Sequence, residues 1–370
     1  MLKIVVISIF STIWMTGLMF AANTLSVSPS KENKPSALMM NEISVAASLL
    51  PDSQVQGMKV TLNLASRLLT VYEGNVKVHI YPVGVGKIST PTPIGYYKVT
   101  DKEINPEWID PDNTNFRIES GEENPLGYRW IGLFGNYGIH GTNKPESIGG
   151  YVSNGCIRMY EKDVENLYNV IPLGTPVEIY YDRIVIDRNV DHTISYYIYP
   201  DGYKRQPLDI YTVRKALAGY GVDNFESNEN ISEKINNSDG QPTFIAKAYT
   251  LIVNGKRINL KAVGKDDSVY LPAVAVAAAV KSDLIWNAEK GILISPYGEV
   301  KGIVKNNVLY FHGSDADTLF HLHGILTDQL IYELNTVQSE PISSTQQTVT
   351  DKKNNIKPIS TGKMLKITYK

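Results

Sequence analysis

Cysteine is the rarest residue type in this sequence: the 370 residues contain only Cys156. A single thiol excludes a disulfide framework within the chain and any zinc or iron–sulfur site built from several thiolates. An excess of basic residues is also missing, since 36 Lys and Arg face 38 Asp and Glu, for a formal net charge of -2. This balance argues against a nucleic-acid partner, which requires a basic surface.

Disorder of the whole chain is excluded as well. Hydrophobic residues make up 43% of the sequence and charged residues 20%, which is enough apolar material for packed cores. At about 100–200 residues per domain, the length predicts two or three domains.

An apolar run without charges lies at the N-terminus, over residues 4–22, with Lys3 before it and Lys31 as the next basic residue. This pattern is typical of a secretory signal, and its length is also close to the roughly 20 residues that span a bilayer. We therefore expect residues 1–22 to be a signal peptide or a membrane anchor. The rest of the chain would be exported to the cell envelope, either in the cell wall or at the outer face of the cytoplasmic membrane.

Composition and periodicity divide the exported part. Residues 23–57 are rich in Ser, Asn, Lys and Pro and are expected to be a linker. Residues 58–182 contain short runs of alternating hydrophobic residues and one helical pattern at 161–170. This combination predicts a mostly-β domain.

Beyond this domain we predict a connecting region and linker (183–243), a small α+β accessory domain (244–335) and a mostly disordered tail (336–370). In the connecting region, 208–220 is typical of a short helix, and the polar stretch 224–243 indicates a flexible linker. The accessory domain has strand patterns around an alanine-rich helix at 272–280. A fainter copy of its strand-then-helix pattern begins at 306–310.

The candidate chemistry lies around Cys156. A free thiol has a pKa near 8.5 and needs a base within hydrogen-bond reach to become a nucleophile. His140 is the only His near it in sequence. Gly155 leaves backbone N–H groups free to face a developing oxyanion, and Arg158 would share a face with Cys156 in a strand and pair with a substrate carboxylate. Spacing alone favours the alternative of a buried Cys, a solvated Arg and a His that fills a turn.

Residues 58–181 resemble the L,D-transpeptidase catalytic domain (the YkuD type), a β-sandwich fold of bacterial cell-wall enzymes. The matching stretches are Thr90–Gly95, Asn105–Trp108, Asn124–Gly127, Ile139–Thr142 and Ser153–Met159. One residue departs from the pattern: the family usually has Ser-His-Gly-Cys, and here Asn154 takes the place of that His. This puts in doubt any donation or substrate contact that the usual His makes.

The resemblance implies a mechanism that needs no metal or organic cofactor. His140 accepts the thiol proton and is oriented by the Gly141 carbonyl. Cys156 attacks the diaminopimelate carbonyl of a peptidoglycan tetrapeptide stem and expels the terminal D-alanine. The N–H groups of Gly155 and Cys156 hold the oxyanion, with Arg158 and Ser153 positioning the stem. The amine of a second stem then resolves the thioester, which cross-links the cell wall.

Two other functions stay open on the sequence. The same chemistry with water as acceptor would make the chain an L,D-carboxypeptidase. A non-catalytic cell-wall-binding protein, with Asn154 as a sign of decay, is the third possibility.

The accessory region carries a second, shorter resemblance. Residues 249–294 are similar to the small repeat at the N-terminus of copper amine oxidases, which implies a non-catalytic module without copper. A group of acidic and imidazole side chains in this region could in principle bind metal: His312, Asp315, Asp317, His321 and His323. Because no tight spacing fixes four ligands, we expect them to be surface polar residues.

Overall fold

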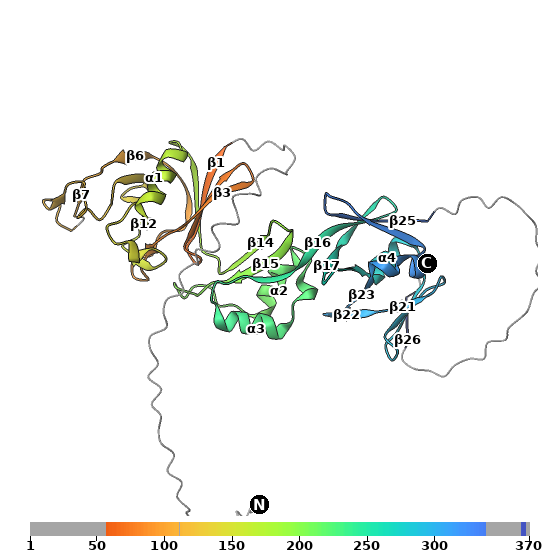
Figure 1. Cartoon of the computed structure of the whole chain (residues 1–370). Coiled ribbons are helices and arrows are strands. Elements are labelled where there is room, and N and C mark those ends of the chain that lie inside the picture. The colour runs from red at the N-terminus through yellow and green to blue at the C-terminus, as the bar shows by residue number, and fades with distance from the viewer. Residues whose placement is uncertain (1–56, 111, 338–363, 368–370) are drawn as a thin grey trace, which may run out of the picture. The chain divides into compact units, whose positions relative to one another are not determined.

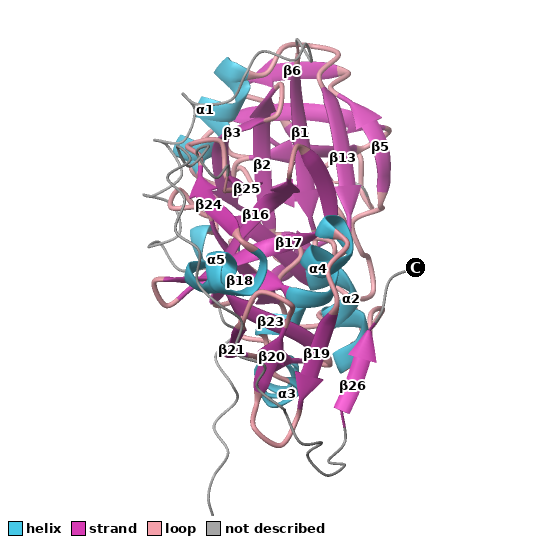
Figure 2. Ribbon diagram, turned by 90° about the vertical axis from the view of Figure 1, so that its right-hand side faces the viewer, coloured by secondary structure: helices cyan, strands magenta, loops and turns pink. Residues whose placement is uncertain are grey.

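The structure, a computed structural model, describes residues 57–110, 112–337 and 364–367 (Figure 1). The predicted signal peptide or anchor (1–22) lies outside these ranges, as do almost all of the predicted linker and most of the predicted tail. In the described part of the chain, no helix has the length and apolar character needed to cross a membrane. Strands dominate the described residues, which confirms the prediction of a mostly-β protein (Figure 2).

The first sheet of the predicted catalytic domain has five strands in the order β3-β2-β1-β13-β5. They span Met58–Asn63 (β1), Leu68–Glu73 (β2), Val76–Pro82 (β3), Gly95–Lys98 (β5) and Pro176–Tyr180 (β13). β1 pairs antiparallel with β2 and parallel with β13, so the first and last strands of the domain lie side by side.

The second sheet has four strands in the order β12-β10-β9-β6. They span Asp101–Ile104 (β6), Arg129–Phe134 (β9), Tyr137–His140 (β10) and Ile157–Arg158 (β12). β10 and β12 run parallel, and parallel neighbours need a crossover connection. That connection contains the 3-10 helix η3 (Pro145–Ser147) and β11 (Tyr151–Ser153), which pairs with β4 (Val85–Gly86). A separate hairpin joins β7 (Trp108–Ile109) to β8 (Arg117–Ile118).

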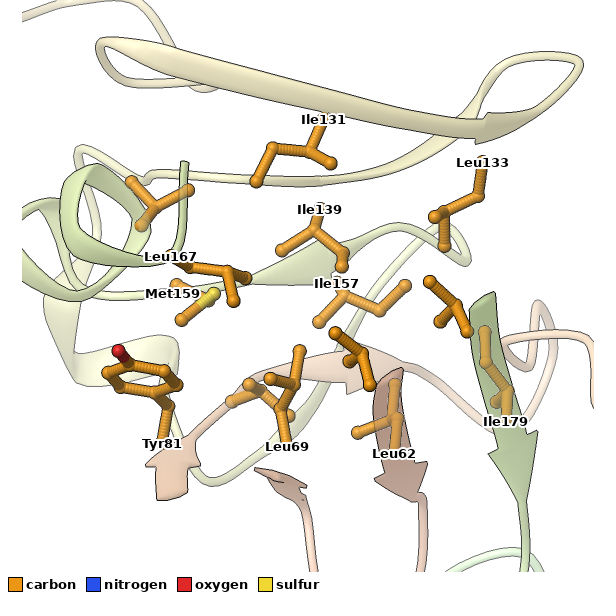
Figure 3. Close-up of a cluster of buried hydrophobic side chains, with 14 of the residues drawn as sticks. Leu62, Leu69, Tyr81, Ile131, Leu133, Ile139, Ile157, Met159, Leu167 and Ile179 are labelled. Carbon is orange, nitrogen blue, oxygen red and sulfur yellow. The ribbon is translucent and has the colours of Figure 1, made fainter. Parts of the chain in front are cut away.

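The two sheets pack face to face around one hydrophobic core. The facing side chains are Leu62, Leu69 and Ile179 from the first sheet and Ile131, Ile139 and Ile157 from the second (Figure 3). Burial of each such side chain contributes about 1.5–3 kcal/mol. Helix α1 (Glu161–Val170) packs on this core through Val164 and Leu167. The helix begins and ends at the predicted residues, and these two positions form its apolar stripe.

Tyr203 lies beyond the predicted end of this domain at 182, yet its ring belongs to the same core and is 5% exposed. The ring stacks on Tyr181 at a centroid distance of 5.4 Å, and its hydroxyl donates to the Gly86 carbonyl at 2.6 Å. A turn closed by Lys204 N–H and the Asp201 carbonyl brings the chain back to the sheet. The packing of the domain therefore extends further along the chain than the strand pattern indicates.

Nine strands from residues 183–337 form one sheet, with the path β14-β15-β16-β17-β18-β23-β22 and with β25 pairing with both β16 and β24. Its strands span Ile184–Arg188 (β14), Thr193–Ile198 (β15), Thr243–Val253 (β16), Lys256–Lys265 (β17), Ser268–Pro272 (β18), Ile303–Lys305 (β22), Val308–His312 (β23), Leu322–Leu326 (β24) and Ile331–Thr336 (β25). Because β15 pairs with β16, the predicted connecting region is joined to the accessory domain in one sheet.

The prediction of a flexible linker at 224–243 is wrong for most of that stretch. It contains helix α3 (Asn228–Asn237), which follows the 3-10 helix η4 (Asp223–Phe225), and the Ser227 hydroxyl caps α3 by accepting from the Asn230 N–H. Ile231 is fully buried in a core shared with α2 (Ile210–Ala218), the helix expected at 208–220. The polar composition hid α3, because its apolar stripe consists only of Ile231 and the partly buried Ile235.

The accessory region contains a strand–helix–hairpin arrangement twice, as the faint repeat indicates. Helix α4 (Ala273–Val280) lies between β18 and the hairpin of β19 (Leu284–Asn287) and β20 (Ile292–Ile294). Helix α5 (Ala316–Phe320), after the 3-10 helix η5 (Gly313–Asp315), lies between β23 and the hairpin of β24 and β25. The two copies meet where β18 pairs antiparallel with β23. The resemblance to the copper amine oxidase repeat stays a prediction.

A further sheet combines β19 and β20 with β21 (Glu299–Lys301) and β26 (Met364–Ile367), in the order β21-β20-β19-β26. β26 falls inside the predicted disordered tail and pairs antiparallel with β19. A short part of that tail is therefore a strand.

Candidate active site

Strands β10 and β12 place the predicted nucleophile and base on one face of the second sheet. Ile139 of β10 lies opposite Ile157 of β12, and both side chains point into the core. Side chains alternate along a strand, so His140, Cys156 and Arg158 point to the other face. The Cys156 thiol donates to the carbonyl oxygen of Asn136, just before β10, at 3.4 Å. The structure thus brings together the three side chains that the sequence singles out for the chemistry.

His140 is held in one orientation. Its Nδ1 lies 2.6 Å from the carbonyl oxygen of Gly141, and the side chain is almost completely buried. A carbonyl oxygen can only accept, so Nδ1 carries the proton and Nε2 keeps a lone pair. The Trp130 ring stacks on the imidazole, with centroids 6.0 Å apart. The geometry therefore supplies the Gly141 contact that the resemblance implies.

Burial sets the protonation state of this pair. The pKa of His140 is lowered to about 4: burial is the largest cause, the charge of Arg158 acts in the same direction, and the Gly141 hydrogen bond acts in the opposite one. Burial also raises the pKa of the Cys156 thiol, against the effects of a Gly138 backbone hydrogen bond and of Arg158. At neutral pH both groups are therefore neutral. A neutral thiol and a neutral imidazole are the forms that general-base activation of a thiol starts from.

Ser153 is part of the turn that carries the nucleophile. Its side chain is 2% exposed, its hydroxyl donates to the Cys156 carbonyl at 2.6 Å, and it accepts from the Gly155 N–H at 3.0 Å. The Ser153 hydroxyl therefore holds the turn together, and its expected contact with a substrate stem stays a prediction. The same hydrogen bond occupies the Gly155 N–H, so of the two expected oxyanion donors only the N–H of Cys156 is left.

Gly155 is required by the turn for two reasons. Its φ of +122° lies in a region that residues with a side chain rarely adopt. A Cβ at this position would also lie 2.4 Å from Cε1 of the Tyr137 ring. Gly155 therefore shapes the backbone beside Cys156, in place of the direct oxyanion contact that the sequence predicts.

Asn154 and Arg158 flank Cys156 on the two sides. Asn154, which stands where the family usually has a His, is exposed. Arg158 is half-buried, and its Nε is buried without a hydrogen-bond partner among the described residues. A buried guanidinium N–H without a partner is costly unless a ligand completes it. This position suits an incoming carboxylate.

Two further residues support the turn and were missed from the sequence. The Thr92 hydroxyl donates to the Gly155 carbonyl at 2.8 Å and accepts from the Gly86 N–H at 2.9 Å. The Tyr203 hydroxyl donates to the carbonyl of the same Gly86. Thr92 lies in a stretch that matches the family, which could have drawn attention to it. No sequence signal indicates that Tyr203 returns to the active-site turn.

In the part of the chain that the structure describes, metal-binding side chains do not gather into a site. Over residues 57–110 and 112–337, no group of three or more His, Cys, Asp and Glu side chains lies close enough together to hold a metal ion. Of the accessory-region residues considered above, His321 and Asp317 form an exposed pair, with Nδ1 and Oδ1 3.5 Å apart.

Comparison with known proteins agrees with the geometry. Residues 58–179 match the family model described as the L,D-transpeptidase catalytic domain (YkuD). The chain is 42% identical over 127 residues to a Bacillus subtilis protein named "Putative L,D-transpeptidase YqjB", covering 32% of this chain and 69% of the relative. It is 37% identical over 131 residues to "Putative L,D-transpeptidase YkuD" of the same organism, covering 35% of this chain and 70% of the relative.

A solved structure of an L,D-transpeptidase from Mycobacterium tuberculosis is 22% identical and has a TM-score of 0.29, covering 33% of this chain and 57% of that one. The sequence matches decide the family, because they reach 37–42% identity over about two thirds of each Bacillus relative. This chain belongs to the L,D-transpeptidase family of enzymes, and residues 58–179 are its catalytic domain.

Proposed function

We propose that this chain is a peptidoglycan L,D-transpeptidase with Cys156 as its nucleophile. One observation carries the proposal: Nδ1 of His140 donates to the Gly141 carbonyl, which leaves Nε2 free on the sheet face where Cys156 lies. Family membership supplies the substrate class, the tetrapeptide stems of peptidoglycan.

In the first half of the reaction, Nε2 of His140 takes the thiol proton as Sγ of Cys156 attacks the diaminopimelate carbonyl carbon. The Cys156 N–H donates to the oxyanion, and one such donor contributes about 10²–10³ in rate. Collapse of this intermediate breaks the C–N bond to D-alanine, whose nitrogen takes the proton from His140. A thioester and free D-alanine result.

In the second half, the side-chain amine of another stem attacks the thioester carbonyl and passes a proton to His140. The C–S bond breaks, the Cys156 sulfur takes that proton back, and the two stems are joined by an amide. Arg158 is the candidate to hold a stem carboxylate, because its side chain is partly exposed and lies on the same face of the second sheet as Cys156. Asn154, two residues before Cys156, is an exposed amide.

The proposed location follows from the substrate and from the N-terminus. Peptidoglycan lies outside the cytoplasmic membrane, and residues 1–22 have the pattern of a signal peptide or anchor. We place the enzyme in the cell envelope, exported or tethered through residues 4–22. The accessory region would then serve wall attachment or spacing.

The same thioester could be resolved by water, which would make the chain an L,D-carboxypeptidase. The two products separate these functions: a transpeptidase yields cross-linked dimers, whereas a carboxypeptidase yields shortened monomers. Both release D-alanine, so only the ratio of dimer to tripeptide monomer distinguishes them. A non-catalytic wall-binding protein would form neither product.

The test is to incubate the purified chain with tetrapeptide muropeptides and to analyse products by mass spectrometry. We expect D-alanine and dimers linked through two third-position residues. In parallel, the protein exposed to a carbapenem should gain the mass of one drug molecule on the Cys156 peptide. Absence of both the dimer and the adduct would overturn the proposal, and adduct with tripeptide monomer alone would assign the carboxypeptidase.

The pH dependence of acylation follows from the pKa of His140. The neutral imidazole is the competent form, and burial lowers this pKa to about 4. With this pKa the imidazole stays neutral down to about pH 5 and becomes protonated only in more acidic solution. The rate constant for acylation should therefore fall only below about pH 5, with a midpoint near 4. Carbapenem acylation followed between about pH 3 and pH 8 measures this. A midpoint near the ordinary His value of 6.5 would show that the imidazole is solvated in the working enzyme.

A further inference from the structure

Glu161 is the first residue of α1 and lies close to the backbone beside His140. Its Oε1 accepts from the Thr142 N–H at 2.7 Å, and its Oε2 accepts from the Tyr128 N–H at 3.1 Å. One N–H donor on each oxygen is the arrangement that an ionised carboxylate accepts. The side chain therefore joins α1 to the segment that follows β10 and to the segment that precedes β9.

The Thr142 N–H belongs to the same peptide group as the Gly141 carbonyl. This group is planar, so fixing its N–H also fixes the direction of its carbonyl. The Gly141 carbonyl in turn accepts from Nδ1 of His140 at 2.6 Å. A continuous chain of contacts thus runs from the Glu161 carboxylate through one peptide group to the imidazole.

We propose that Glu161 is a positioning residue of the active site, whose carboxylate orients His140 through the Gly141–Thr142 peptide group. This rests on the proposed function, in which His140 is the base for Cys156. The carboxylate also polarises the peptide group. When the Thr142 N–H donates to the carboxylate, the Gly141 C=O of the same peptide group becomes a stronger acceptor for Nδ1 of His140. The Glu161 carboxylate thus has the role of the third side chain of other Cys–His sites, but it acts on His140 through a peptide group that lies between them.

The carboxylate lies against two glycines, where any larger residue would meet it. A Cβ on Gly141 would lie 2.1 Å from Oε1 of Glu161, and a Cβ on Gly127 would meet the same oxygen even more closely. Both neighbours therefore have to be glycine for the carboxylate to reach the two N–H groups. Val164 and Leu167 anchor α1 in the core, so the carboxylate is presented from a rigid element.

The adjacent turn of α1 offers a matched control. Glu165 lies one helical turn beyond Glu161 and pairs with Arg129, at 3.6 Å between Nη2 and Oε1. It is 44% exposed, and no hydrogen bond from it to the segment around His140 is found in the described residues. A change of charge on α1 alone would affect Glu161→Gln and Glu165→Gln alike, whereas a positioning role concerns Glu161 only.

The experiment compares the full chain with Glu161→Gln and Glu165→Gln. Glutamine keeps the shape but turns an NH₂ toward one of the two N–H donors, so one contact becomes repulsive. We expect the maximal rate constant for carbapenem acylation to fall about 10- to 100-fold in Glu161→Gln, with half-saturation unchanged, and to stay within about twofold in Glu165→Gln. Nitrogen-15 NMR of the imidazole should show His140 protonated at Nδ1 in the wild type and a mixture of tautomers in Glu161→Gln.

Unchanged acylation in a folded Glu161→Gln chain, or an equal loss in Glu165→Gln, would overturn the proposal. The NMR readout needs no turnover, so it decides on Glu161 even if the chain proves inactive on stems and carbapenems. Should Glu161→Gln not fold, amide exchange in the wild type decides instead. The Thr142 and Tyr128 amides must then be protected from exchange, and exchange at the rate of open loops would refute the contacts.

Discussion

The Cys156→Ala chain is expected to release no D-alanine, to form no dimers and to gain no carbapenem mass. Alanine removes the only nucleophile that can form the thioester, and water attacking the stem directly lacks the covalent route. The rate should fall by about 10⁴-fold or more, as when the nucleophile of another covalent enzyme is removed. D-alanine release and intact-protein mass measure the loss.

Folding has to be separated from chemistry in this test. Cys156 is partly exposed on the outer face of the second sheet, and its neighbour Ile157 makes the core contacts. Cys156→Ala should therefore melt within a few degrees of the wild type, and Cys156→Ser is the matched control for shape. Serine keeps the contact to the Asn136 carbonyl but ionises far less readily, so it should be nearly as inactive. Normal dimer formation by folded Cys156→Ala would remove Cys156 from the mechanism.

The sequence predicts a mostly-β domain and α1 because their signals are local, whereas the β-sandwich arrangement came from the family resemblance. Alternating residues such as Leu62 and Leu69 are buried by the pleat itself, and Val164 and Leu167 lie on one helix face. The pairing of His140 with Cys156 could not be derived from spacing, since it depends on two strands being parallel. The family resemblance supplied that part.

Other features escaped because they depend on contacts between distant segments. The Ser153 hydroxyl is engaged inside the turn, which its place beside the nucleophile does not indicate. Glu161 is typical of an acidic residue at a helix N-terminus, yet its carboxylate binds two other segments. Tyr203 reaches the core through a turn more than a hundred residues after Gly86. Such residues are recognisable only once the strands are placed.

The His140→Gln chain should lose about 10²- to 10⁴-fold in acylation rate at pH 7, the contribution of a general base. Glutamine cannot take the thiol proton, so the reaction then depends on the small fraction of thiolate. Burial raises the pKa of Cys156, which makes this fraction smaller than for a free thiol. The residual rate should therefore rise about tenfold per pH unit above neutrality, up to the thiol pKa, whereas the wild type is flat over the same range.

Carbapenem acylation at about pH 6–9 measures both profiles, with His323→Gln as control. His323 is exposed on β24, in the accessory region, and its replacement should leave rate and profile unchanged. A His140→Gln chain that reacts within about threefold of the wild type, with a flat profile, would mean that the proton leaves Cys156 by another route. In that case Arg158, whose charge lowers the pKa of Cys156, would be the candidate to stabilise the thiolate. If the rate of the His140→Gln chain rises with pH instead, proton removal is assigned to His140. The buried imidazole, which is neutral at pH 7, would then explain how the enzyme works without a preformed thiolate.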